Sequence, residues 1–245
     1  VYSRYFKEQV VGGAQGSWLW GLSVGIAMLT VAISSPVLGA IADFSGTKKR
    51  FLFFFTSVAV IFTAMLFFVN EGNILLGMLF FILAEIGYRG AQVFYNSLLT
   101  EIAAQEEMGR ISGIGWAIGS AGGILCLLLV LPLIMLFEGT LIVRISFIIT
   151  GIYFAAFTIP LFLWLRERTD GRPLPEGENY LSVGFRQTLT TLRAVKNYRE
   201  FIKFVVAFLI YNDGVIMALN FAAIIGDVLF GMGQQDLIIF VILVQ

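Results

Sequence analysis

Six apolar runs dominate this sequence, each close to or above the length that a helix needs to cross a membrane. They cover approximately residues 18–42, 51–69, 74–99, 111–137, 142–165 and 201–230, and a seventh run begins at about residue 237. A helix of about 20 residues crosses the hydrocarbon core of a bilayer. The runs lack the alternation of apolar and polar residues that is typical of membrane β-strands. The sequence therefore predicts an all-α membrane protein.

The composition supports a lipid environment and excludes several kinds of chemistry. Hydrophobic residues make up 58% of the chain and charged residues only 13%, about half the charged content of a soluble domain. The net charge is zero, so nothing points to nucleic acid as a partner. There is no histidine and one cysteine, Cys126, so we predict no metal site, no cofactor and no disulfide. No phosphate-binding loop and no nucleophile beside a base is present, and we expect no enzyme.

The basic residues between the runs predict an orientation. The gaps at 43–50, 100–110 and 166–200 together carry eleven lysines and arginines, and the gaps at 70–73, 138–141 and 231–236 carry none. Loops rich in Lys and Arg stay in the cytoplasm. The first set of gaps is therefore predicted to be cytoplasmic in a multi-pass integral membrane protein.

The long gap at 166–200 divides the chain into a bundle at 1–165, a cytoplasmic linker and the start of a second bundle at 201–245. Phe185, Leu189, Leu192 and Val195 recur at helical spacing in the linker. This pattern is typical of a helix in the lipid headgroup region and equally of a linker helix packed on protein. Because the chain begins at Val1 and ends within the seventh run, we expect a fragment whose first helix is mostly missing.

Polar residues on one face of the third run form the first candidate site. Glu85, Arg89, Gln92 and Asn96 follow one another at i, i+4, i+7 and i+11. A charge at membrane depth costs at least about 2.5–3.5 kcal/mol, so these groups should face protein or a water-filled cavity. Glu85 is predicted about 16 Å from the outer end of its helix, near the midplane. A substrate pathway and a structural ion pair both fit this spacing.

The sixth run carries a second polar group. Tyr211, Asn212 and Asp213 lie in its middle, and Asn220 follows one heptad after Asp213. Asp213 is predicted about 18 Å from the cytoplasmic end, at a depth similar to that of Glu85. Polar groups near the midplane, where two bundles meet, bind substrates and coupling ions in secondary transporters. A hydrogen-bonded brace between helices is the alternative.

Small residues recur on the fourth run, at Gly115, Gly119, Gly122 and Gly123. Glycines at this spacing let helix backbones approach closely in lipid. We therefore predict a packing surface.

Two short motifs resemble the major facilitator superfamily. Its Gly-x-x-Ala-Asp-x-x-Gly-x-Lys signature, which joins the second and third of twelve helices on the cytoplasmic side, is matched by Gly39, Ala42, Asp43, Gly46 and Lys48. Arg89 with Gln92 resembles the Arg-x-x-Gln motif of its fourth helix. The glycines of the fourth run resemble a motif of its fifth helix, without the proline of that motif and one residue short.

Residues 94–103, 109–123 and 208–215 resemble the vacuole-effluxer-like branch of this superfamily, whose yeast founder is an autophagy-related vacuolar exporter of amino acids. The resemblance implies that the chain covers about helices two to eight of a twelve-helix bundle. The third and sixth runs are then helices four and seven, and helices one, four, seven and ten line the central cavity of this fold.

Together these observations predict a secondary active transporter that works by alternating access, with a small polar solute such as an amino acid as substrate and the proton as a candidate coupling ion. The expected pathway comprises Glu85, Arg89, Gln92, Asn96, Tyr211, Asn212, Asp213 and Asn220. The resemblance implies a conformational latch made of Gly39, Asp43, Gly46, Lys48 and Arg50. We expect a monomer, in a bacterial plasma membrane rather than a vacuolar one. A membrane-embedded binding or regulatory protein without transport, and a lipid flippase or scramblase, are the alternatives.

Overall fold

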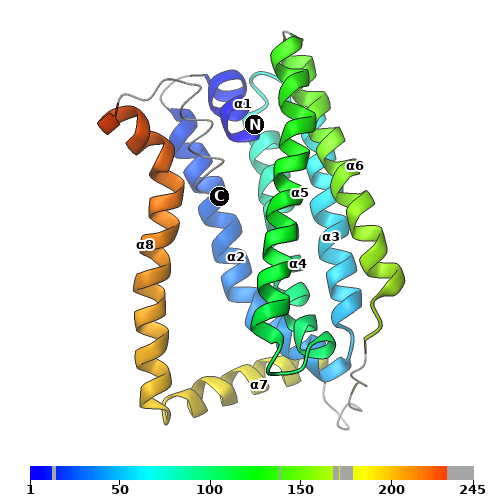
Figure 1. Cartoon of the computed structure of the whole chain (residues 1–245), viewed down its shortest axis with the longest axis vertical. Coiled ribbons are helices and arrows are strands. Elements are labelled where there is room, and N and C mark those ends of the chain that lie inside the picture. Colours follow the sequence, from blue (N-terminus) through cyan, green and yellow to red (C-terminus); the bar gives the residue numbers. More distant parts are fainter. Residues whose placement is uncertain (13–14, 138, 168–170, 172–178, 231–245) are drawn as a thin grey trace. The chain divides into compact units, whose positions relative to one another are not determined.

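The computed structural model describes the chain apart from residues 13–14, 138, 168–170, 172–178 and 231–245, and apart from the side chains of residues 192 and 216–229. Every described element is a helix, which confirms the predicted all-α fold (Figure 1). The chain divides into two compact units, Val1–Thr188 and Leu189–Gln245.

The first five predicted runs are helices of the first unit. They are α2 (Gln15–Ser45), α3 (Lys48–Met65) continued by the 3₁₀ turn η2 (Leu66–Phe68), α4 (Ile74–Ile102), α5 (Met108–Leu136) and α6 (Thr140–Trp164). Within the described residues, these five are long and apolar enough to cross a membrane. Short connections make neighbours antiparallel: α4 packs on α2 and α3, α3 also packs on α6, and α6 packs on α5 (Figure 1).

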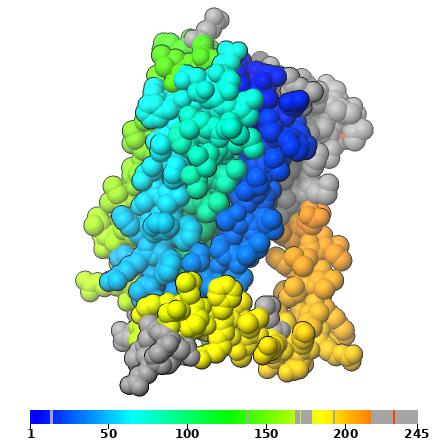
Figure 2. Space-filling model, turned by 180° about the vertical axis from the view of Figure 1, so that it is seen from behind, coloured from blue at the N-terminus to red at the C-terminus, as the bar shows by residue number. Residues whose placement is uncertain are grey.

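Two further helices follow. The linker contains α7 (Tyr180–Val195), and the sixth predicted run lies in α8 (Arg199–Phe230), a continuous helix of 32 residues. The seventh predicted run, from about residue 237, lies outside the described residues. Figure 2 shows the start of α7, in yellow, against the lower part of α2, in blue.

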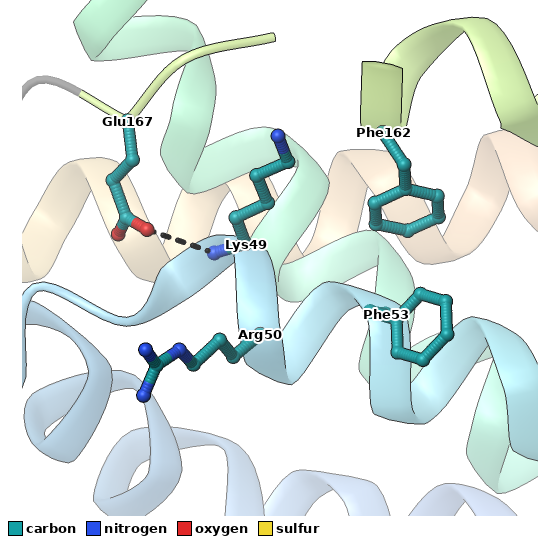
Figure 3. A pocket seen from close by; sticks show the side chains of 5 residues that line it. All are labelled: Lys49, Arg50, Phe53, Phe162 and Glu167. Carbon is teal, nitrogen blue, oxygen red and sulfur yellow. Dashed lines mark hydrogen bonds between the residues drawn. The ribbon is translucent and has the colours of Figure 1, made fainter.

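The turn between α2 and α3 needs a glycine. Gly46 has φ +60°, and the N–H of Thr47 donates to the carbonyl of Ala42 at 3.2 Å. This is the Schellman arrangement that ends a helix, with glycine in the left-handed position. The next helix begins at once, and its first N–H groups, those of Lys48 and Lys49, donate to the carboxylate of Glu167 at 2.6 and 3.3 Å (Figure 3). A carboxylate at this end also complements the helix dipole.

Close contact between α3 and α4 depends on glycines of α4. A Cβ at Gly87 would overlap the backbone N of Ala59 and lie 2.8 Å from the carbonyl oxygen of Phe55. At Gly90 a Cβ would overlap the ring of Phe55, which itself stacks on Phe94 at 5.6 Å between centroids. Small residues bring helix backbones together in lipid, where dispersion contacts replace the hydrophobic effect.

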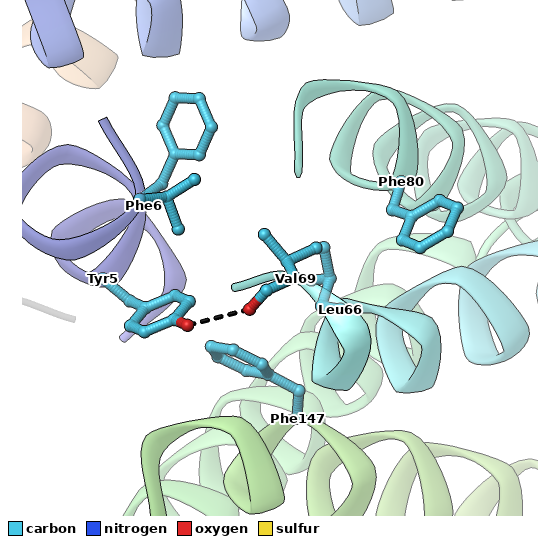
Figure 4. Packing of buried hydrophobic residues seen from close by; sticks show 7 residues of the cluster. Tyr5, Phe6, Leu66, Val69, Phe80 and Phe147 are labelled. Carbon is cyan, nitrogen blue, oxygen red and sulfur yellow. Dashed lines mark hydrogen bonds between the residues drawn. The ribbon is translucent and has the colours of Figure 1, made fainter. Parts of the chain in front are cut away.

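Aromatic residues from a segment to which the sequence analysis assigned no element close the end of the bundle where α4 begins. Residues Tyr2–Tyr5 form α1 and residues Phe6–Val11 a π-helical turn, η1. The Tyr5 hydroxyl donates to the carbonyl of Val69 at 2.8 Å (Figure 4). The Tyr2 ring lies edge-on to Phe147, with 5.3 Å between the ring centroids. Burial raises the pKa of the Tyr5 phenol, so it remains a neutral donor at pH 7.

The glycine contact predicts a stability difference between two equivalent substitutions. Gly87→Ala should lower the free energy of unfolding by about 1–3 kcal/mol, because the new methyl group forces α3 and α4 apart. Gly123→Ala should cause no loss, since no described atom lies within 4 Å of its Cβ position and alanine favours a helix. Reversible unfolding in mixed micelles, followed by circular dichroism, measures both. Equal stability of the two variants would contradict this packing.

Candidate functional site

An ion pair lies in the middle of α4. Arg89 Nε donates to Glu85 Oε1 at 2.8 Å, one turn apart on the helix. The Glu85 side chain is 19% exposed and the Arg89 side chain 41%. The pair therefore has a partner for each charge, yet the guanidinium remains open on the surface of this unit.

On the predicted polar face of α4, Arg89 and Gln92 also contact Tyr88. Gln92 Nε2 donates to the hydroxyl of Tyr88 at 3.1 Å, and the Arg89 guanidinium lies 5.7 Å from the centroid of the Tyr88 ring. Asn96 is exposed. Tyr88, which is not among the predicted pathway residues, thus contacts two of them.

The two faces of α4 differ in chemistry. Phe80, Ala84, Ala91, Phe94 and Leu98 are buried and belong to the face that packs on the neighbouring helices. Glu85, Arg89, Gln92 and Asn96 are partly or fully exposed. Because Arg89 and Asn96 stay accessible on this polar face within Val1–Thr188, the face is available to line a water-filled space.

The second predicted polar group lies on α8. Tyr211 and Asp213 are exposed and Asn212 is half-buried. The side chain of Asn220 lies outside the described residues. These residues belong to the second unit, and their proximity to the α4 stripe stays a prediction.

A buried lysine, Lys48, connects the end of α2, the start of α3 and the end of α4. Lys48 Nζ lies 2.9 Å from Asp43 Oδ1 and 3.1 Å from Glu101 Oε1. The side chains of Lys48 and Glu101 are 9% and 6% exposed, and that of Asp43 is 55% exposed. The Lys48–Glu101 pair is thus buried, whereas the Asp43 contact borders solvent.

This network includes one residue that the predicted latch lacks. Glu101, at the last turn of α4, pairs with the buried side of Lys48, and the sequence analysis gave it no role. Asp43 pairs with the Lys48 cation, and the N-terminus of α3 is capped by Glu167. Glu101 and Glu167 each follow the end of an apolar run. This position is the signal in the sequence that could have marked them.

The remaining predicted latch residues make fewer contacts. Gly46 forms the turn through its positive φ, and no described atom lies within 4 Å of a Cβ built at Gly39. Arg50 lines an open cavity of about 410 Å³ together with Lys49, Phe53, Phe162 and Glu167 (Figure 3). Lys49 Nζ donates to the carbonyl of Leu165 at 2.5 Å, which adds a second link between α3 and the chain after α6.

The glycines of α5 do not take part in close packing within the described residues. A Cβ at Gly115 would lie 3.5 Å from the Tyr95 hydroxyl and one at Gly122 3.8 Å from the Tyr153 hydroxyl, and none would contact a described atom at Gly119 or Gly123. Their packing partner stays a prediction. Within the described ranges, no group of three His, Cys, Asp or Glu side chains is placed to hold a metal ion.

Comparison with known proteins identifies similar chains. The model of the family described as "Vacuole effluxer Atg22 like" matches residues 19–245. The "Uncharacterized MFS-type transporter YxiO" of Bacillus subtilis (strain 168) is 30% identical over 256 residues, which cover 100% of this chain and 59% of that protein.

Fungal relatives are also similar. "Autophagy-related protein 22-1" of Aspergillus niger is 26% identical over 58% of this chain and 24% of its own length. "Autophagy-related protein 22" of Yarrowia lipolytica is 27% identical over 51% of this chain and 24% of its own length. This chain thus spans only part of each relative. No solved structure matches it.

The Lys48 network predicts a rescue experiment. Lys48→Gln should lower the free energy of unfolding by about 3 kcal/mol, because the buried Glu101 carboxylate loses its ion pair with Lys48. Adding Glu101→Gln should restore most of the loss, since no buried charge then remains. Asp43→Asn should cost less than about 1 kcal/mol because that carboxylate borders solvent.

The same unfolding measurement in mixed micelles tests these three variants. A Lys48→Gln protein that Glu101→Gln fails to stabilise would show that the buried pair does not hold α3 to α4.

Proposed function

The chain belongs to the vacuole effluxer Atg22-like family, and we propose that it forms part of a secondary active transporter that works by alternating access. The main support for this proposal is the Glu85–Arg89 pair in the middle of α4, on a polar face where the Arg89 side chain is 41% exposed. Charges at this depth need protein partners or water. A cavity that opens to either side of the membrane would supply that water.

A zwitterion such as an amino acid is the proposed substrate class. The Arg89 guanidinium retains N–H donors beyond the one given to Glu85, and a guanidinium binds a carboxylate through two parallel hydrogen bonds. Asp213 or Glu85 would exchange the coupling proton. The description of the family as vacuole effluxer Atg22-like supports export of a solute.

The Lys48 network is proposed as the latch of the conformational cycle. It connects three helix ends on the cytoplasmic side through one cation. Its Asp43 arm is largely exposed, so it can separate at little cost, while the buried Glu101 arm keeps α3 and α4 together. Gly39, Gly46 and Arg50 would allow and flank the movement of the turn.

The proposed location is the plasma membrane of a bacterium, which the similarity over the whole chain to a Bacillus subtilis protein supports. The multi-pass character of the chain follows from the five apolar helices among the described residues. The proposed working form is a monomer.

Transport assays on the full-length protein in sealed proteoliposomes test the proposal, with a mixture of radiolabelled amino acids as the probe. The double variant Glu85→Gln with Asp213→Asn should lose uptake driven by a pH gradient and keep exchange of solute across the membrane, since neutral side chains carry no proton. Glu107→Gln, an exposed cytoplasmic acid, is the matched control and should behave as the parent.

Asp43→Asn separates the latch from the pathway in the same assay. It should leave equilibrium binding and pH dependence unchanged and slow turnover about fivefold, the effect of about 1 kcal/mol on a rate. Saturable binding without flux in the parent protein would instead identify a membrane-embedded binding protein. Movement of fluorescent phospholipid without amino-acid flux would identify a flippase or scramblase.

A further inference from the structure

The linker helix α7 begins with its own capping interactions. Asn179 Oδ1 accepts the N–H of Ser182 at 2.7 Å, and Ser182 Oγ accepts the N–H of Asn179 at 3.2 Å. These reciprocal bonds satisfy two backbone donors at the start of the helix, as in a capping box. The helix therefore starts at a defined residue and is not a continuation of α6.

One side of α7 is fixed to the flank of α2. Val183 is buried, and the Thr188 hydroxyl donates to the carbonyl of Pro36 at 3.2 Å. A Cβ at Gly184 would lie 2.8 Å from Cγ1 of Ile41, so glycine is needed for this contact. Figure 2 shows the corresponding contact between the yellow and blue segments.

This contact has a defined depth along a helix that is long and apolar enough to span the membrane. Pro36 lies nine residues and Ile41 four residues before the cytoplasmic end of α2 at Ser45, which corresponds to about 14 and 6 Å. Interfacial helices bury their apolar face about 5–10 Å into the boundary between headgroups and acyl chains. The start of α7 is therefore held at the level of the cytoplasmic leaflet.

A different side of α7 is apolar and has no partner in the described structure. Leu181, Phe185 and Leu189 are each at least half exposed and follow one another at i, i+4 and i+8, on one face of the helix. That face lies beside the helix side that contacts α2 and not opposite it. A bilayer surrounding α2 would therefore meet this apolar face directly.

All charged residues of α7 are basic. Residues Tyr180–Val195 include Arg186 and Arg193 and no acid, and Lys196 and Arg199 follow. Basic residues beside a membrane-embedded apolar face bind anionic headgroups of the cytoplasmic leaflet. An apolar face on a basic helix is thus suited to both the acyl chains and the anionic headgroups of one leaflet.

We propose that α7 is an interfacial helix that inserts Leu181, Phe185 and Leu189 into the cytoplasmic leaflet and binds anionic phospholipid through its basic residues. This assignment decides between the two interpretations that the sequence left open for the linker. It is independent of transport, since it depends only on the contacts and charges of α7.

Site-specific fluorescence in proteoliposomes tests the insertion. In the full-length protein with Cys126→Ser, Phe185→Cys carries an environment-sensitive fluorophore, and Gln187→Cys is the control on another face of the helix. In vesicles that contain phosphatidylglycerol, the label at 185 should be quenched by nitroxide-bearing lipid and protected from aqueous iodide. The label at 187 should show the reverse.

Each other pattern overturns the proposal. A label at 185 that neither quencher reaches would show that another part of the protein covers this face. A label at 185 that iodide quenches would show that the face is in water. Insertion of equal extent in pure phosphatidylcholine would show that anionic headgroups play no part.

Charge removal tests the headgroup contact. Arg193→Gln with Lys196→Gln should lower the equilibrium constant for insertion about 25-fold, since each basic residue near an anionic surface contributes about a factor of five. Arg110→Gln removes an exposed charge from another cytoplasmic connection and should leave insertion unchanged. An equal decrease of the insertion constant in the α7 double variant and in Arg110→Gln would show only a general attraction of basic residues to the membrane. It would overturn specific binding by α7.

Discussion

A charged side chain inside a bilayer has to be paired, and this constraint explains the arrangement of the described helices. Among the described residues, three charged centres occur along the bundle: Lys48 with its two acids at the end of α4, Glu85 with Arg89 in the middle of α4, and Arg144 near the start of α6. Arg144 donates to the carbonyl of Phe67 and to Asn70 Oδ1, both at 2.5 Å. The contacts of Lys48 and Arg144 join different helical elements and fix them in register, whereas the Glu85–Arg89 pair lies within α4.

Helix α4 connects two of these centres. Glu85 lies in its middle, and Glu101 lies sixteen residues later in its last turn, about 24 Å along the axis. A rigid movement of α4 would therefore change the space around Arg89 and the geometry at Lys48 together. Rigid-body motion of packed helices is a common way in which distant sites are coupled. The proposed pathway and the proposed latch are in this sense parts of one element.

The hydropathy of the sequence was sufficient to predict the helices, and their boundaries agree with the apolar runs to within a few residues. Membrane helices are predictable because every backbone group has to be bonded within its own segment. The sequence did not predict which residues pair with the charged side chains. Lys48 is 53 residues from Glu101, and its N–H bonds to Glu167, which is 119 residues away.

The N-terminal segment was missed for a related reason. Tyr2 to Val11 is too short and too polar to be predicted as a span, and it is ordered by aromatic contacts with α2, α4 and α6. Among the glycines, those of α5 match a motif, yet Gly87 and Gly90 of α4 make the close contacts. Spacing alone does not tell which glycine faces a neighbouring backbone.

Alternating access requires that the polar face of α4 line a cavity that opens to alternate sides of the membrane. Asn96→Cys, in the full-length protein with Cys126→Ser, tests it in sealed proteoliposomes of known orientation with a membrane-impermeant maleimide. The account predicts labelling from the outside and from the inside, with a saturating amino-acid substrate shifting the ratio. Labelling from one side only, unchanged by any solute, would contradict alternating access.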